Sequence, residues 1–214
     1  MRFKLLSMAA ALAVAAPAFA DTVNLSGFTF TPATSVSVSS PNYSGQAGQF
    51  TGLLNGNSFV TYCTDLAQSF AFNTNYTDYT VVSGVSAWGA QRSLDLDRWI
   101  SWNDQFAYPT DAAMSAAVQA AVWEILYETS GSYDLAGGTF VATSGDSATQ
   151  TWMNSVNWAG LSSVNVTQHV DQLYSREHQD FLVMTAVPEP STYALFAAGL
   201  AGIGFIARRR TRAA

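Results

Sequence analysis

Apolar and polar residues alternate in short runs after the first 20 positions of the chain. Such alternation turns one face of a strand toward a core, and aromatic and β-branched residues favour the same structure. Asn55-Gly56-Asn57 is a hairpin turn signal, whereas the polar, glycine-containing stretch Pro41 to Gly48 predicts a loop. The strands predicted here are Thr22–Phe30, Ser35–Ser39, Phe50–Leu54, Ser58–Cys63 and Thr80–Val85.

The spacing becomes helical in the middle of the chain. Leu96, Trp99 and Ile100 predict a helix that begins at about residue 87 or 94 and ends near Trp102. Asp111 to Glu128 is the strongest helical segment, because it is rich in alanine, contains no proline or glycine, and begins at a capping residue.

Short β-like runs return after Gly138. They are Thr139–Ala142, Ser163–Thr167 and Phe181–Ala186, with a short helix predicted at Thr151–Trp158. This order, in which helices stand between two groups of strands, predicts an α+β fold. We expect a β-rich sandwich or barrel-like lobe and an inserted helical lobe. The 214 residues are enough for one domain of this kind.

The charges are distributed unevenly. Six of the nine basic residues lie near the two ends, so that only Arg92, Arg98 and Arg176 accompany the fifteen acidic residues of the interior. The only lysine is Lys4. An interior this acidic is unsuited to neutralising phosphates, which argues against nucleic-acid binding.

Residues 1–20 have the pattern of a secretory signal peptide. Arg2 and Lys4 precede an apolar run, and Ala18-Phe19-Ala20 is a small-residue cleavage site. The mature protein is therefore expected to begin at Asp21, outside the cytoplasm.

The C-terminal end, residues 187–214, combines three features in a fixed order. Pro188-Glu189-Pro190 precedes an apolar run at residues 193–207, and Arg208-Arg209-Arg210 follows it. The run predicts a short membrane helix, and arginines that stay inside place the 21–186 domain on the periplasmic side of the inner membrane.

This tail resembles the PEP-CTERM sorting signal. The resemblance implies a Gram-negative host and an exosortase-type membrane protease that cleaves near Pro188-Glu189-Pro190. It also implies transient anchoring in the inner membrane, followed by release to the cell surface or into an exopolysaccharide matrix.

Cys63 has no other cysteine with which to form a disulfide. On a helical wheel of residues 111–128, Gln119 lies at the centre of an apolar stripe with Trp123, and Glu124 and Glu128 lie on the opposite side. A buried glutamine amide must be hydrogen-bonded or take part in chemistry. Both an ordinary core amide and a covalent partner of Cys63 are consistent with this position.

The two segments resemble the motifs of bacterial surface thioester domains. Tyr62-Cys63-Thr64-Asp65 matches the aromatic-Cys-x-Asp motif, and Gln119 to Glu124, with Trp123, matches the later helical motif. The resemblance covers roughly residues 59–127. It implies a β-rich lobe plus a helical lobe, and a thioester between Cys63 and Gln119 that binds a target covalently.

The expected activity is attachment rather than turnover, so the protein is not expected to be an enzyme or to need a metal or cofactor. An amine on a surface or matrix target would attack the thioester and form a stable amide. After removal of the signal peptide the chain contains no lysine, so no ε-amine of its own competes for this reaction.

Other site chemistries have less support in the sequence. A cysteine hydrolase needs a histidine beside Cys63, and neither His169 nor His178 lies in such a motif. Asp95, Asp97 and Asp104 lack the spacing of a calcium loop and are expected on a solvated helix face. Glu124 and Glu128, on the outer side of their helix, do not fit a pair of glycosidase carboxylates.

The alternative functions are non-covalent binding of exopolysaccharide and a structural role in a matrix, without a thioester. Aromatic rings are platforms on which sugars stack, although Trp99 and Trp123 fall on apolar helix faces and are expected in the core. The tryptophans are Trp88, Trp99, Trp102, Trp123, Trp152 and Trp158.

Overall fold

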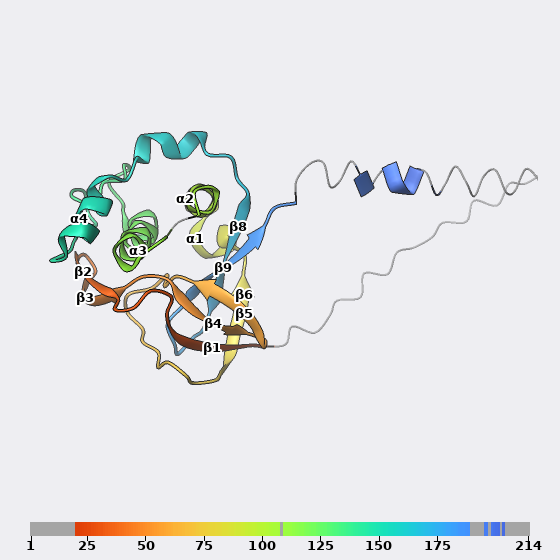
Figure 1. Ribbon diagram of the computed structural model, residues 1–214, viewed down its shortest axis with the longest axis horizontal. Helices are drawn as coiled ribbons and strands as arrows, with labels where there is room; N and C mark the ends of the chain where they lie inside the picture. The colour runs from red at the N-terminus through yellow and green to blue at the C-terminus, as the bar shows by residue number, and fades with distance from the viewer. Residues whose placement is uncertain (1–19, 108, 189–194, 197, 202, 204–214) are drawn as a thin grey trace, which may run out of the picture.

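The computed structural model describes residues 20–107, 109–188, 195–196, 198–201 and 203. Helices gather above two β-sheets (Figure 1). The larger sheet has six antiparallel strands in the order β5-β4-β1-β6-β8-β9. Its strands are β1 (Asp21–Phe28), β4 (Phe50–Leu54), β5 (Asn57–Thr61), β6 (Tyr76–Val82), β8 (Gln168–Tyr174) and β9 (Phe181–Ala186).

This sheet curves until its two edges almost meet. Beyond β5, Cys63 forms an isolated antiparallel bridge with Phe181 of β9. The Leu182 N–H donates to the Tyr62 carbonyl, and the Thr64 N–H donates to the Asp180 carbonyl, both at 2.9 Å. The α+β class and the barrel-like lobe predicted from the sequence are thus confirmed, and Cys63 lies at the seam of the barrel.

The smaller sheet corrects the predicted loop at residues 41–48. Its order is β3-β2-β7, with β2 at Thr34–Ser39, β3 at Asn42–Ala47 and β7 at Ala142–Thr143. The polar composition of β3 does not suggest a strand, but it pairs with β2 in antiparallel register along its whole length, from Asn42 to Ala47. Val36 and Val38 of β2 are buried, and both strands pack against α3.

The helices α1 to α4 are inserted between β6 and β8, which confirms the predicted helical insertion. The helix expected to begin at about residue 87 or 94 is two helices, separated at Gly89, whose φ of 84° suits glycine. The helices are α1 (Gly84–Trp88), α2 (Ala90–Gln105), α3 (Ala112–Tyr127) and α4 (Ser147–Asn154), followed by the 3₁₀ helix η1 (Trp158–Ser163).

The long helix α3 agrees with the sequence prediction to within one residue at each end. The Asp111 side chain accepts from the Met114 N–H at 2.8 Å and so caps the first turn. The short helix α4 begins four residues earlier than expected. The strand predicted at residues 163–167 is wrong, because η1 occupies its start and the true strand, β8, begins at Gln168.

The prediction that Glu124 and Glu128 lie on an outer face of α3 is also wrong. Every residue from Met114 to Ile125 is buried, Glu124 is 0% exposed and Glu128 is 4% exposed. The segment that follows α3 folds back over this side, and its backbone donates to both carboxylates. Asp95 and Asp97 of α2 are buried too, where Asp95 accepts from the Tyr133 hydroxyl and Asp97 from the Val170 N–H.

Within the part of the chain that the structure describes, no helix is long and apolar enough to cross a membrane. The predicted signal peptide lies almost wholly outside the described residues. The same holds for Glu189 and Pro190, for most of the apolar run at 193–207 and for Arg208-Arg209-Arg210.

Candidate functional site at Cys63

Cys63 and Gln119 lie in direct contact, although 56 residues separate them. The Cys63 N–H donates to Gln119 Oε1 at 2.9 Å, and Gln119 Nε2 donates to the Cys63 carbonyl at 2.8 Å. The two residues are 2% and 1% exposed, respectively. The seam of the barrel therefore meets the middle of α3 at the two residues that the sequence analysis paired.

This double hydrogen bond has two chemical consequences. It satisfies one acceptor and one donor of the buried amide, as a purely structural glutamine requires. It also fixes the acyl group of Gln119 beside Cys63 and directs a backbone N–H at its oxygen. A donor in that position stabilises an oxyanion if the acyl carbon is attacked.

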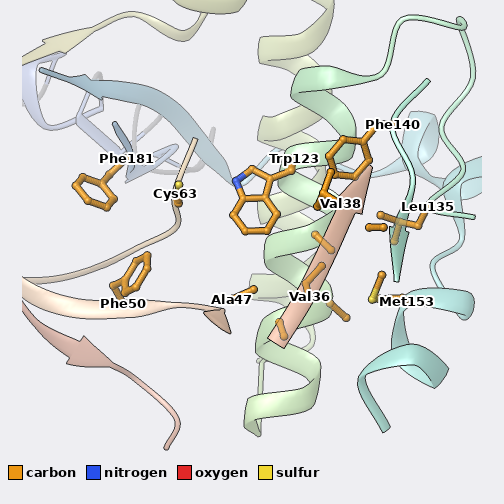
Figure 2. Close-up of a cluster of buried hydrophobic side chains, with 14 of the residues drawn as sticks. Val36, Val38, Ala47, Phe50, Cys63, Trp123, Leu135, Phe140, Met153 and Phe181 are labelled. Atoms are coloured by element: carbon orange, nitrogen blue, oxygen red, sulfur yellow. The ribbon is translucent and has the colours of Figure 1, made fainter. Parts of the chain in front are cut away.

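Three groups surround the sulfur. The Cys63 thiol donates to the Asp65 carbonyl, and Gln179 Nε2 donates to Sγ and to the same carbonyl. The indole nitrogen of Trp123 points toward the sulfur (Figure 2), without a regular hydrogen bond to any described residue. Gln179 lies between β8 and β9, and no local motif in the sequence connects it with Cys63.

The pKa of the Cys63 thiol is raised well above its ordinary value. Burial is the largest cause, and the negative charge of Asp65 adds to it. The donors from Trp123, the backbone near Asp65 and Gln179 act in the opposite direction. The free thiol is therefore protonated at neutral pH.

Tyr62 and Asp65 hold the residues around Cys63 in place. Tyr62 is buried, and its carbonyl forms part of the seam. One carboxylate oxygen of Asp65 accepts from the Ala67 and Gln68 N–H groups at 2.8 and 2.7 Å, and the other accepts from the Asp180 N–H at 2.8 Å. The aspartate of the predicted motif thus ties the loop after Cys63 to the start of β9.

A hollow of about 140 Å³ reaches both Cys63 and Gln119. Its wall is mainly aromatic, and Phe72 is 38% exposed. The hollow has room for the end of a slender side chain. The aromatic residues are Phe28, Tyr43, Phe50, Phe70, Phe72 and Trp123.

The two histidines have other contacts. His169 Nδ1 lies 3.0 Å from Asp97 Oδ2, and the His178 ring packs on Tyr76 with centroids 4.3 Å apart. Neither forms a hydrogen bond with Cys63, so the described residues contain no Cys–His pair. They also contain no group of three acidic, histidine or cysteine side chains that could hold a metal ion.

Trp99 and Trp123 are buried, as their helix faces predicted. Trp102 and Trp158 are half-buried beside a separate hollow of about 410 Å³. Each packs against Trp99, with ring centroids 5.5 and 5.7 Å apart. These four tryptophans therefore lie in two regions, Trp123 at the sulfur and the other three between α2 and η1.

Comparison with known proteins identifies the tail of the chain. Residues 186–210 match the family model described as the PEP-CTERM protein-sorting motif, which confirms the resemblance found in the sequence. The motif implies processing by an exosortase-type membrane protease and export through the inner membrane to the cell surface. No curated protein and no solved structure matches the chain. A function for the domain that precedes the motif must be argued from its own residues.

Proposed function

We propose that this exported domain forms an internal thioester between Cys63 and Gln119 and uses it to attach to amine groups of a surface or matrix partner. The observation that carries the proposal is the reciprocal hydrogen bonding between Gln119 and the backbone of Cys63. It holds the acyl group of Gln119 against the backbone of Cys63, the residue that carries the nucleophile, inside a shielded core.

The proposed reaction exchanges the amide nitrogen for sulfur. The sulfur of Cys63 attacks Cδ of Gln119, and the Cys63 N–H stabilises the oxyanion that forms on Oε1. The C–N bond then breaks, and Nε2 leaves as ammonia after taking up the thiol proton. An amide does not give way to a thiol readily in water, and the fixed geometry supplies the high effective molarity that the reaction needs.

A partner amine would then open the thioester. Its nitrogen attacks the same carbon, an amide forms, and Cys63 is released as a thiol. The hollow of about 140 Å³ offers a route to the bond, and the mature chain contains no lysine that would react there first.

Intact mass of the mature protein tests this proposal. We expect the wild type to be lighter than its sequence by one ammonia, and Cys63 to resist alkylation until methylamine opens the bond. Gln119→Ala should leave Cys63 as a free thiol, whereas Gln150→Ala on α4 is a control that should retain the mass deficit. Full calculated mass, together with direct alkylation of Cys63 after mild loosening of the fold, would rule the thioester out.

A second candidate function is non-covalent binding of a neutral glycan at the 410 Å³ hollow. Its wall combines tryptophan rings with side-chain amides and contains no charged residue, a composition suited to sugar rings and their hydroxyls. The residues that support this candidate are Trp99, Trp102, Gln105, Asn157, Trp158 and Asn165.

Affinity electrophoresis in gels that contain a neutral polysaccharide such as dextran or laminarin separates the two candidates. Glycan binding predicts a retardation that persists in Cys63→Ala and is lost in Trp158→Ala. Trp88→Ala is the matched control, since Trp88 is half-buried outside this hollow. Equal mobility of the wild type and Trp158→Ala in every gel would exclude this candidate.

A further inference from the structure

We infer that Gln179 and Trp123 form a pair of donors that stabilises the sulfur of Cys63 as a leaving thiolate during acyl transfer. The inference rests on the proposed thioester and adds two residues to its chemistry. Both groups contact or face the atom that gains negative charge.

The first donor is held from both ends. The backbone carbonyl of Gln179 accepts from the Tyr79 hydroxyl at 2.6 Å. The side-chain Nε2 of Gln179 donates to the Asp65 carbonyl at 3.1 Å and also to the sulfur. The next residue, Asp180, donates its N–H to Asp65 and accepts from the Ser175 N–H at 2.8 Å. Gln179 is thus fixed to the same loop that positions Cys63.

The second donor is otherwise unexplained. Trp123 follows Gln119 by one helical turn and is 2% exposed, so its indole nitrogen is shielded from water. That nitrogen has no hydrogen-bond partner among the described residues, and it points at the sulfur (Figure 2). Buried donors are rarely left unpaired, and those that are call for an explanation. A sulfur that becomes negatively charged during the reaction supplies one.

The sulfur needs such donors because its surroundings oppose negative charge. Burial and the charge of Asp65 both raise the pKa of the thiol. When an amine attacks the thioester, the C–S bond breaks and its electron pair moves to Sγ. The proton lost by the amine finally returns to that sulfur. Hydrogen bonds to charged groups are stronger than those between neutral groups, so the two donors act most at the moment of bond breaking.

The rate of methylamine incorporation, followed by intact mass on the mature protein, tests this role. Gln179→Leu should react about tenfold to a hundredfold more slowly than the wild type, as expected for loss of a hydrogen bond to a charged group. Trp123→Phe should also react more slowly. Gln68→Leu is the matched control, because its amide binds the Arg176 carbonyl on the neighbouring loop and does not contact the sulfur.

A second measurement is independent of thioester formation. In a Gln119→Ala background, Cys63 is a free thiol and the pH profile of its alkylation reports its pKa. Adding Gln179→Leu, or Gln179→Met if the leucine variant does not fold, should move this profile to higher pH. An unshifted profile would overturn the donor role. A wild type that has lost no ammonia would instead refute the thioester alone.

Discussion

The two sides of α3 bury polar groups in opposite ways. On one side, Gln119 and Trp123 face Cys63, where a neutral amide, a thiol and an unpaired indole N–H share a small space. On the other side, Glu124 and Glu128 bind the backbone of the segment that follows the helix. Both sides are buried, so burial alone does not distinguish a functional site from a structural one.

The hydrogen bonding of Glu128 does distinguish it from the sulfur site, whereas Glu124 Oε2 on the same side of the helix has no partner among the described residues. Burial alone would raise the pKa of Glu128, but donors from Thr139, Phe140 and Ser130 outweigh it and hold that pKa far below its usual value. Both oxygens of the Glu128 carboxylate accept hydrogen bonds from the surrounding residues. At the sulfur, by contrast, the Trp123 N–H points at a neutral thiol and makes no regular hydrogen bond with the described residues. An incomplete set of partners beside a nucleophile is therefore the feature that suggests chemistry.

The largest expected effect is on amine labelling, which should differ between variants on the two sides of α3. Gln119→Ala should abolish incorporation of methylamine completely, because no acyl group remains opposite Cys63. Glu124→Gln, five residues further along on the other side of the same helix, should leave labelling intact. Mass spectrometry of both variants after exposure to methylamine provides the comparison. Methylamine incorporation into Gln119→Ala that disappears when Cys63 is also replaced would contradict this prediction.

The next effect concerns stability. Glu128→Ala should lower the free energy of unfolding by about 2–4 kcal/mol, because it removes the acceptor of several buried donors at once. Urea denaturation followed by circular dichroism measures the loss. Glu177→Ala is the control, since Glu177 is exposed and should change little. A loss in Glu128→Ala no larger than in this control would show that the segment after α3 does not depend on the carboxylate.

The two glutamates should also respond oppositely to pH. The lowered pKa of Glu128 contributes stability above its unfolded value of about 4.3, and this contribution is lost as the pH falls below it. Burial raises the pKa of Glu124 to about 7, although the Asp134 N–H opposes the shift. Its contribution is therefore full at low pH and is lost as the pH rises toward 7.

Melting temperatures of the wild type and Glu124→Gln across this range test the sign. The melting temperatures of the two proteins should differ least near about pH 4. As the pH rises through about 7, the melting temperature of the variant should increase relative to that of the wild type. Asp180, whose pKa burial raises to about 6, contributes the same trend in both proteins and cancels in the difference. A difference that does not change with pH would mean that Glu124 ionises freely in the fold.

The smallest expected effect lies on the sulfur side. The Tyr127 hydroxyl accepts from the Leu66 N–H at 3.1 Å and so fastens the loop that follows Cys63. Tyr127→Phe should cost about 1 kcal/mol in the free energy of unfolding. Tyr174→Phe, at an exposed position, is the matched control. If both variants unfold at the same urea concentration, this hydrogen bond does not contribute to the stability of the loop.

Local patterns were sufficient for much of the fold. The turn at Asn55-Gly56 has φ values of 53° and 79°, which asparagine and glycine adopt more readily than other residues, and α3 follows from its alanine content and its Asp111 cap. These features depend on neighbours within a few positions, and so does the sorting motif at the end of the chain. The order of strands, helices and strands gave the α+β class for the same reason.

The candidate site could be predicted only in part. A helical wheel places Gln119 and Trp123 on one face, and the strand predicted at Ser58–Cys63 places Cys63 at its end, so the types and positions of Cys63 and Gln119 suggest a pair. The wheel could not show that the opposite face is covered, because the segment that covers it lies outside the helix. It therefore misplaced Glu124 and Glu128.

By itself, the sequence determined most of the elements, the sorting motif at residues 186–210 and the restriction of lysine to Lys4. The tertiary structure decided which edges meet. Closure of the barrel brings Phe181 to Cys63 and Gln179 to its sulfur, across more than 110 residues of chain. Contacts at that distance depend on how the whole sheet curves and on what α3 packs against, and no short stretch of residues encodes either.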